Sequence, residues 1–216
     1  MNLVILGPQG CGKGTQAEML AEKFNIEHID MGNFLREVAK MDTPLGREVF
    51  DIQNVTKTLV PSRILREVLH FKLADMPQEK GIVFDGVPRT MDQAKYFEEA
   101  LLEFGRKLTK LVYIKLSEEE SIGRISKRRE CQSCRKRFII GKDIKENEKT
   151  CFCGGKITQR IDDTPEGIKK RLKVFEEETV PVINYFDKKG LVMEINGNKS
   201  PKEVFEEVLK KLKSVI

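Results

Sequence analysis

The residues with the clearest chemical meaning form a glycine-dense loop that ends in a lysine, close to the start of the chain. A short apolar run from Leu3 to Leu6 precedes the loop and predicts a buried strand, and apolar residues then recur at helical spacing. The loop reads Gly7-Pro8-Gln9-Gly10-Cys11-Gly12-Lys13-Gly14-Thr15. Glycine lets successive backbone N–H groups point inward, and the N-terminus of a helix favours an anion. The arrangement predicts a phosphate-binding loop in which Lys13 supplies a point charge for terminal phosphates.

The loop departs by one residue from the general phosphate-binding pattern G-x-x-x-x-G-K-[ST]. Gly14 follows Lys13, so the hydroxyl arrives only at Thr15. The alternative interpretation is an ordinary glycine-rich turn between a strand and a helix. A charged lysine would have no structural purpose in such a turn, which favours phosphate binding. Cys11 is expected only to fill a small position in the loop.

A second candidate for phosphate chemistry is an acid at the end of another apolar run. Residues 81–85 read G-I-V-F-D and predict a buried strand that ends at Asp85, and Arg89 follows four residues later. A carboxylate at the end of a strand beside a phosphate loop organises Mg²⁺, usually through bound water. We therefore expect Asp85 to act with the Mg²⁺ that accompanies a nucleotide.

Four of the five cysteines lie within residues 127–163, and their spacing indicates a metal site. Cys131-x2-Cys134 is followed by sixteen residues and then by Cys151-x-Cys153. Two such knuckles supply four thiolates to one tetrahedral ion, zinc, and leave no open position for catalysis. A lobe this small and polar needs a metal in place of a core. The second knuckle is one residue shorter than usual, so an unmetallated lobe of free thiols is the alternative.

The elements that hold these residues alternate between strand and helix. Strand-length apolar runs recur at residues 110–116 and 191–195, separated by longer stretches with helical periodicity. Such alternation predicts a parallel sheet covered by helices on both faces. Two segments interrupt it, the mixed polar residues 30–60 and the cysteine-bearing residues 127–163.

Two capping boxes mark the starts of predicted helices. Residues 117–120 (S-E-E-E) precede a helix that is expected to carry Arg124 and Arg128 on one face, because the two arginines are four positions apart. Residues 200–203 (S-P-K-E) precede the last helix. That helix is expected to bury one apolar stripe, formed by Val204, Phe205, Val208, Leu209 and Leu212.

Composition and charge bound the class of protein. The 216 residues are 39% hydrophobic, contain no Trp and carry a formal charge of +5. This length allows one core with inserts, or at most two domains. No apolar run approaches the roughly 18 residues of a membrane span, and the chain starts without a basic leader or cleavage site. We therefore expect a cytoplasmic protein with no membrane partner.

Together these motifs resemble the adenylate kinases with a zinc-type lid. The resemblance rests on G-P-Q-G-C-G-K-G-T-Q, D-G-V-P-R-T-M-D-Q-A, the arginines before the cysteines, and Q-R-I-D-D with a later arginine, in this order over essentially the whole chain. It implies an α/β P-loop fold of three layers with a parallel sheet. The core would be residues 1–29, 61–126 and 164–216, with a monophosphate-binding insert at 30–60 and a zinc-binding lid at 127–163. The implied reaction is reversible, Mg²⁺-dependent transfer of the terminal phosphoryl group from ATP to AMP, giving two ADP, by a monomer without a nucleic-acid partner.

The resemblance also implies roles for individual residues. The ATP-binding set is Gly10, Cys11, Gly12, Lys13, Gly14, Thr15, Arg124, Arg128 and Lys199. The AMP-binding set is Met31, Arg36, Leu59, Val60, Gly86, Arg89, Gln93, Arg160 and Arg171, in which Arg36 and Arg89 clamp the phosphate and Gln93 reads the adenine edge. The catalytic set is Lys13, Asp85, Arg89, Arg124, Arg128, Arg160 and Arg171, with Asp162 and Asp163 beside the arginines. Planar guanidinium groups suit this chemistry, because phosphoryl transfer depends on positioning and on cancelling charge spread over oxygens.

Departures from the family cluster in the monophosphate site. Adenylate kinases commonly read S-T-G-D where residues 30–33 read D-M-G-N, so the thioether of Met31 replaces a hydroxyl. Val87 replaces the usual Phe, and residues 57–61 lack a common Gly. A kinase of the same fold with another acceptor base is therefore an alternative, although Gln93 favours adenine because uridylate and cytidylate kinases commonly carry Asn there. A third alternative, supported by the basic residues near the cysteines, is a zinc-ribbon nucleic-acid-binding protein with a phosphate loop.

Overall fold

The computed structural model describes residues 1–56, 58–74, 76–160 and 163–213. The first half of the chain forms β1 (Asn2–Leu6), α1 (Lys13–Phe24), β2 (Glu27–Asp30), α2 (Met31–Val38), α3 (Pro44–Asp51), the π-helix η1 (Ile52–Thr56), α4 (Ser62–Ala74), β3 (Ile82–Asp85) and α5 (Met91–Glu103). The second half forms β4 (Lys110–Lys115), α6 (Glu118–Ser126), β5 (Arg128–Cys131), β6 (Arg137–Ile139), β7 (Ile157–Thr158), α7 (Pro165–Val174), the π-helix η2 (Phe175–Thr179), α8 (Val180–Asp187), β8 (Val192–Asn196) and α9 (Pro201–Lys213).

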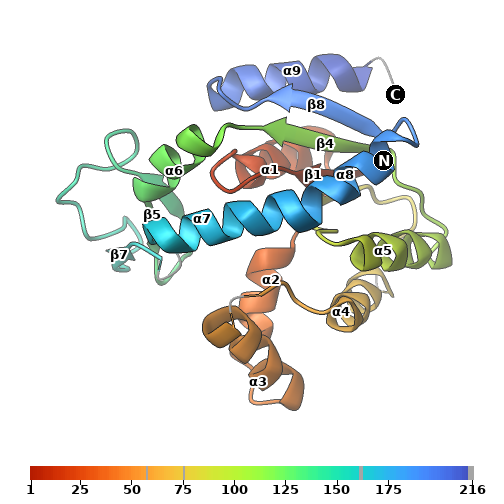
Figure 1. Cartoon of the computed structure of the whole chain (residues 1–216), viewed down its shortest axis with the longest axis horizontal. Helices are drawn as coiled ribbons and strands as arrows, with labels where there is room; N and C mark the ends of the chain where they lie inside the picture. The colour runs from red at the N-terminus through yellow and green to blue at the C-terminus, as the bar shows by residue number, and fades with distance from the viewer. Residues whose placement is uncertain (57, 75, 161–162, 214–216) are drawn as a thin grey trace.

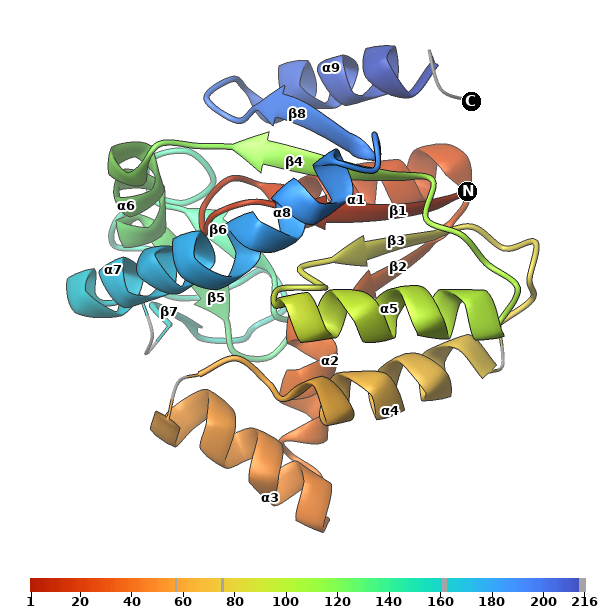
Figure 2. The same cartoon turned by 45° about the vertical axis from the view of Figure 1, so that its right-hand side comes forward.

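A five-stranded sheet with the order β2-β3-β1-β4-β8 lies at the centre, and every neighbouring pair is parallel (Figures 1 and 2). Strand β1 lies in the middle and is buried along its whole length. Alternate side chains of a strand point to opposite faces, so one buried strand supplies two cores. Val4 and Leu6 pack with α4, α5 and α8, whereas Leu3 and Ile5 pack with α1 and α9. The three-layer α/β architecture confirms the predicted fold class.

The ends of the helices follow the local signals in the sequence. In the last capping box, the Ser200 hydroxyl accepts from the Glu203 backbone N–H at 3.3 Å, and the Glu203 carboxylate accepts from the Ser200 N–H at 3.0 Å. Val204, Val208 and Leu212 of α9 are buried as predicted. Among the described residues, no helix has both the length and the apolar character needed to cross a membrane.

The edge strand β2 has no counterpart among the predicted strands. Its sequence, E-H-I-D, is short and polar, and only Ile29 is buried. The strand pairs with β3 alone. Because it follows α1 closely and needs only one apolar anchor, its hydrophobic pattern is too weak to be recognised.

The prediction that Arg124 and Arg128 share one helix face is wrong. Helix α6 ends at Ser126, and Arg128 is the first residue of β5. Strand β5 pairs in antiparallel fashion with β6 and with β7, which are distant in the sequence. A spacing of four residues fits a helix, but the pairing with later strands ends α6 before it reaches Arg128.

Two groups of elements extend from the sheet (Figure 1). Helices α2 and α3 with η1 lie below the sheet in that view, and the small sheet β6-β5-β7 lies at its left. We call the second group the lid. Its core is small, consisting of Cys131, Phe138, Ile144, Cys151 and Ile157. The small size of this core makes the lid dependent on other stabilising interactions.

Candidate active site

One cleft of about 1500 Å³ collects the side chains predicted to act on substrates. It opens where β1, β2 and β3 end, and it is walled by the core, by α2 and by the lid. Every residue that the resemblance assigns to catalysis or to a nucleotide lines this cleft, from Gly10 in the loop to Lys199 before α9. The chain thus brings distant segments together, since the ends of parallel strands meet at one edge of a sheet.

The phosphate loop joins β1 to α1 and has the geometry of an anion site. Gly12 precedes α1 with a φ of 89°, a conformation that favours glycine, and no side chain caps the helix. The first N–H groups of α1 therefore face the cleft without a side-chain acceptor. Lys13 folds back over the loop, where its Nζ lies 3.4 Å from the carbonyl oxygens of Gly7 and Pro8. The space that a Cβ on Gly14 would fill is taken by the Arg137 guanidinium and bordered by Asp85 Oδ2, so both charged groups lie close to the first turn of α1.

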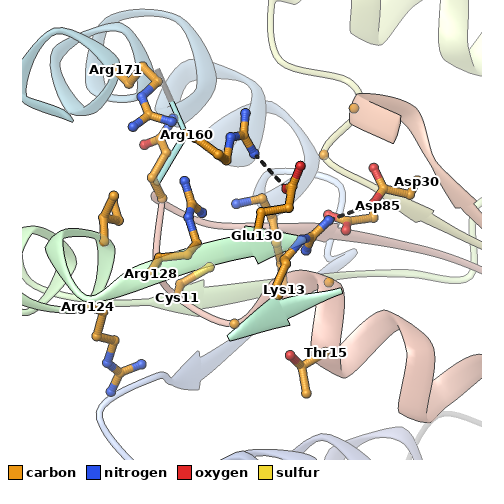
Figure 3. Close-up of a pocket in the computed structure, with 18 of the residues that line it drawn as sticks. Cys11, Lys13, Thr15, Asp30, Asp85, Arg124, Arg128, Glu130, Arg160 and Arg171 are labelled. Atoms are coloured by element: carbon orange, nitrogen blue, oxygen red, sulfur yellow. Dashed lines mark hydrogen bonds and ion pairs between the residues drawn. The ribbon is translucent and has the colours of Figure 1, made fainter. Parts of the chain in front are cut away.

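Asp85 lies beside a second carboxylate and a histidine for which the sequence predicts no role. The register of β2 and β3 places Asp30 opposite Asp85, and Figure 3 shows their side chains next to each other. His28 Nε2 lies 3.8 Å from Asp85 Oδ2. Burial works to raise the pKa of Asp85, but His28 and the charge of Lys13 outweigh it and hold that pKa below its ordinary value. His28 lies two residues before Asp30 and so on the same face of β2, and the register with β3 brings it to Asp85.

Asp163 holds two of the predicted arginines. Arg128 donates from Nε to Asp163 Oδ2 at 2.8 Å and from Nη2 to Oδ1 at 2.6 Å. Arg171 on α7 donates from Nη2 to the same Oδ1 at 2.8 Å. The side chain of Asp163 is 0% exposed, and its backbone carbonyl accepts from Gln159. One buried carboxylate therefore orients a lid arginine and a core arginine together. The predicted neighbour Asp162 lies outside the described residues.

A third acid, Glu130 of β5, faces the cleft from the lid. Its carboxylate lies 3.9 Å from Arg160 Nη1 and 3.3 Å from Arg135 Nη1. Figure 3 shows Glu130 and Arg160 directed toward each other, whereas Arg124 points away from this group. Arg124 instead pairs with Glu120 on its own helix, at 3.5 Å. Of the predicted lid-side arginines, Arg124 thus lines a different part of the cleft.

The predicted acceptor side carries two arginines and an amide. Arg36 on α2 donates to the Asn33 side chain, and Arg89 donates from Nε to the Gly86 carbonyl at 2.6 Å. Burial lowers the pKa of both guanidinium groups, and the charge of Arg160 contributes at Arg36. Since arginine titrates so far above neutral pH, both stay charged and strongly favour an anion.

Gln93 is buried between two backbone groups on this side. Its Nε2 donates to the Val60 carbonyl at 2.8 Å, and its Oε1 accepts from the Arg89 backbone N–H at 2.8 Å. The amide thus has a donor and an acceptor fixed side by side at the wall of the cleft. Met31, Leu59 and Gly86 also line the cleft, and Met31 is buried in the core. Of residues 57–61, where a Gly common in the family is missing, Lys57 lies outside the described residues.

Lys199 lies between β8 and α9 at the rim of the cleft. Its Nζ donates to Glu207 Oε2 at 2.7 Å. The carboxylate raises the pKa of Lys199, and the lysine in turn lowers the pKa of Glu207. Lys199 therefore stays cationic at the edge of the phosphate loop's cleft.

The four lid cysteines form one cluster, as their spacing predicts. Their sulfur atoms all lie within 4.8 Å of one another, with Cys131 and Cys153 at 3.5 Å and Cys134 and Cys151 at 3.7 Å. Zinc–thiolate bonds of about 2.3 Å in a tetrahedron place sulfurs about 3.8 Å apart, so the cluster fits this ion. The backbone N–H of Cys134 lowers the pKa of Cys131 to about 6, which favours the thiolate form, whereas burial raises the pKa of Cys151 to about 12, so a metal would have to displace that proton. A Cβ on Gly155 would collide with Cys131 Sγ, so the short second knuckle depends on the glycine that follows it.

Comparisons with known proteins agree with this geometry. The family model for adenylate kinase matches residues 5–191. The chain belongs to the adenylate kinase family. An adenylate kinase of Methanothrix thermoacetophila is 40% identical over 212 residues, which cover 98% of this chain and 98% of that protein. An adenylate kinase of Archaeoglobus fulgidus is 37% identical over 99% of this chain and 100% of that protein. One of Caldicellulosiruptor saccharolyticus is 39% identical over 98% of this chain and 99% of that protein.

Membership of the adenylate kinase family agrees with the order of motifs, including Asp163 within Q-R-I-D-D, whereas Glu130 belongs to none of these motifs. The sequence predicts Asp163 only as a neighbour of the arginines and predicts no role for Glu130 or His28. Their roles depend on contacts between segments that lie up to 57 positions apart, such as His28 with Asp85. Alternation along β2 could have indicated His28, whereas no local signal marks Glu130.

Proposed function

We propose that this adenylate kinase family member transfers the terminal phosphoryl group of ATP to AMP, reversibly, and so produces two ADP. The observation that carries the proposal is the convergence of a phosphate loop and arginines from three segments on one cleft. Lys13 comes from the core, Arg36 from α2, and Arg128 from the lid. A triphosphate donor and a monophosphate acceptor both bring negative charge to the reacting phosphoryl group, so cationic groups are needed on both sides of it, and this cleft supplies them.

In this proposal the side chains bind and orient rather than react. Lys13 and the loop N–H groups hold the phosphates of ATP, while Arg36 and Arg89 hold the phosphate of AMP. Arg128, Arg160 and Arg171 are directed at the group in transit, where charge spreads over the equatorial oxygens. Asp163 and Glu130 act as positioning residues, because each carboxylate fixes a guanidinium before substrate arrives. Closing the lid over the cleft excludes water, which would otherwise accept the phosphoryl group.

Magnesium would be held on the carboxylate side of the cleft. Asp85 stays ionised and buried beside Asp30, so hard oxygen ligands face the phosphate loop. The ion, when bound with ATP, supplies positive charge to the terminal phosphates. Asp85 would determine on which side of the phosphate loop the Mg²⁺ lies.

The base of the acceptor is proposed to be adenine, on the evidence of Gln93. A glutamine amide pairs bidentately with the donor and acceptor that adenine presents together. The Gln93 amide already has its donor and acceptor aligned by the Val60 carbonyl and the Arg89 N–H. A base entering this wall would take over one or both of these contacts.

We further propose that zinc has a structural role in the lid, with Cys131, Cys134, Cys151 and Cys153 as its ligands. Four protein ligands leave no position for substrate. We also propose that the chain is divided into a core, an insert at residues 30–60 and a lid at residues 127–163. The protein is proposed to be a cytoplasmic monomer whose partners are nucleotides and not nucleic acids.

The test is a coupled assay of ADP formation with ATP and each of AMP, CMP, UMP and GMP. We expect turnover with AMP to exceed that with the other acceptors. A matched Lys13→Met variant should keep the circular dichroism of the parent and lose activity by more than about tenfold, because such a charge contributes several kcal/mol to transition-state binding. Equal turnover with all four acceptors, or a Lys13→Met variant as active as the parent, would contradict the proposal.

A further inference from the structure

Arg137 reaches from the lid to the core, outside the set of residues that the proposed function uses. It begins β6, and its Nη2 donates to Asp30 Oδ2 at 2.9 Å. Asp30 ends β2 in the core, 107 positions earlier in the chain. The pair therefore joins the lid to the core by a contact additional to the chain connections near residues 127 and 163. Its Coulomb energy favours the closed arrangement of the lid.

Asp30 is held in place before it meets the arginine. Its carboxylate caps α2 by accepting from the Asn33 backbone N–H at 2.8 Å, and it also accepts from the Asn33 side chain at 2.7 Å. The register of β2 and β3 fixes it beside Asp85. The side chain of Asp30 is mostly buried, so little rotamer freedom is lost when Arg137 binds.

The other end of the Arg137 guanidinium lies over the phosphate loop. Its Nη1 occupies the space that a Cβ on Gly14 would fill, and Asp85 Oδ2 borders the same space. The charged groups that face this guanidinium are therefore Asp30 and Asp85, and Arg36 is also within electrostatic reach. The guanidinium covers the first turn of α1, whose N–H groups form part of the anion site.

We propose that Arg137 is a lid-positioning residue, which docks the lid over the phosphate loop by binding Asp30 when the cleft holds no nucleotide. The proposal rests on the proposed function only in naming the ligands that later enter the cleft. A guanidinium binds carboxylate and phosphate oxygens with the same fork of donors. Nucleotide phosphates arriving at the loop therefore compete with Asp30 for Arg137, and docking of the lid is linked to their arrival.

The test measures hydrogen exchange of the phosphate-loop amides in the full-length, nucleotide-free protein, with its native metal content. Arg137→Gln should speed exchange at residues 10–16 about fivefold, the effect of one ion pair between partly exposed groups. Asp30→Asn should have the same effect, because Asn removes the charge but still caps α2. The double variant should exchange no faster than either single variant, and Arg137→Lys should restore part of the protection.

The matched control is Arg135→Gln. Arg135 and Arg137 are both 37% exposed, but Arg135 pairs with Glu130 within the lid. Loss of the Arg135 charge should therefore leave exchange at residues 10–16 unchanged. Thermal melting of every variant checks that the fold is retained.

Two results would overturn the proposal. One is an Arg137→Gln variant with parental exchange at the phosphate loop and a parental melting temperature. The other is a double variant whose effect equals the product of the two single effects, since independent residues do not couple. Neither measurement uses a substrate, so a failure here is separate from a failure of the ADP assay.

Discussion

Replacing Asp163 by Asn should destabilise the protein more than any single change to an exposed ion pair. The Asp163 carboxylate is fully buried and accepts three hydrogen bonds, two from Arg128 and one from Arg171. The variant keeps the shape of the side chain, but its amide nitrogen would face a guanidinium and its carbonyl could accept only part of these bonds. Two partly buried cations would then lie close together without the charge of Asp163 between them.

The size of the effect follows from the burial of the three groups. Removing one partner of a buried ion pair costs about 3–5 kcal/mol. Arg128 and Arg171 are 16% and 22% exposed, so water offsets part of that cost, and we take about 3 kcal/mol. For a chain of this length each kcal/mol lowers the melting temperature by about 2–4 °C, so we expect a decrease of about 6–12 °C.

Asp42→Asn provides the matched control. Asp42 and Arg47 lie 2.6 Å apart, the same separation as the shorter Arg128–Asp163 contact, but their side chains are 97% and 65% exposed. Breaking this pair should cost below about 1 kcal/mol. Chemical denaturation and thermal melting of both variants measure the difference. If Asp163→Asn loses no more stability than Asp42→Asn, the Asp163 carboxylate does not contribute to the free energy of unfolding as its burial and contacts indicate.

Three other changes test the remaining assignments. Arg89→Ala should raise the KM for AMP by about tenfold or more and leave the KM for ATP nearly unchanged, since hydrogen bonds to charged groups contribute about 1.5–3 kcal/mol. A similar rise of both KM values in steady-state kinetics would mean that the two sites are assigned wrongly. The parent protein is expected to hold about one zinc ion per chain by elemental analysis, and Cys153→Ser should lose this zinc and melt at a lower temperature. The variant should remain active at low temperature. A variant that keeps the metal would exclude Cys153 as a ligand. Lys199 lowers the pKa of Glu207 in the folded state, so this pair stabilises the fold above the ordinary pKa of about 4.5 and loses its effect as the pH falls through the lowered value. Glu207→Gln should therefore melt below the parent at pH 7 and together with it near pH 3, and a gap that persists in acid would point to lost packing instead.

The parts of the fold that the sequence predicts are those with a local cause. The phosphate loop, the buried strand before it and the capping box at residues 200–203 each depend on neighbours within a few positions. The cysteine knuckles also belong here, because ligand spacing is a property of the chain itself. For the same reason the resemblance to a family could be recognised from motif order alone.

The parts that the sequence does not predict depend on contacts between distant segments. Strand β2 needs β3 beside it, and Arg128 leaves the predicted helix because β5 pairs with β6 and β7. His28 gains a role only when the register brings it to Asp85. In each case the local sequence is compatible with more than one conformation, and the tertiary contact decides which one forms.

The acids around the cleft explain how the chain tolerates so many arginines in one place. Asp30, Glu130 and Asp163 each pair with arginines at the cleft. They offset part of the repulsion and also fix the direction of each guanidinium. Burial, followed by the charge of Arg160, still lowers the pKa of Arg36, so its charged form is held there at a cost in free energy. Anionic substrates offset that cost when they bind, so the fold should gain stability from the same ligands that it is proposed to position.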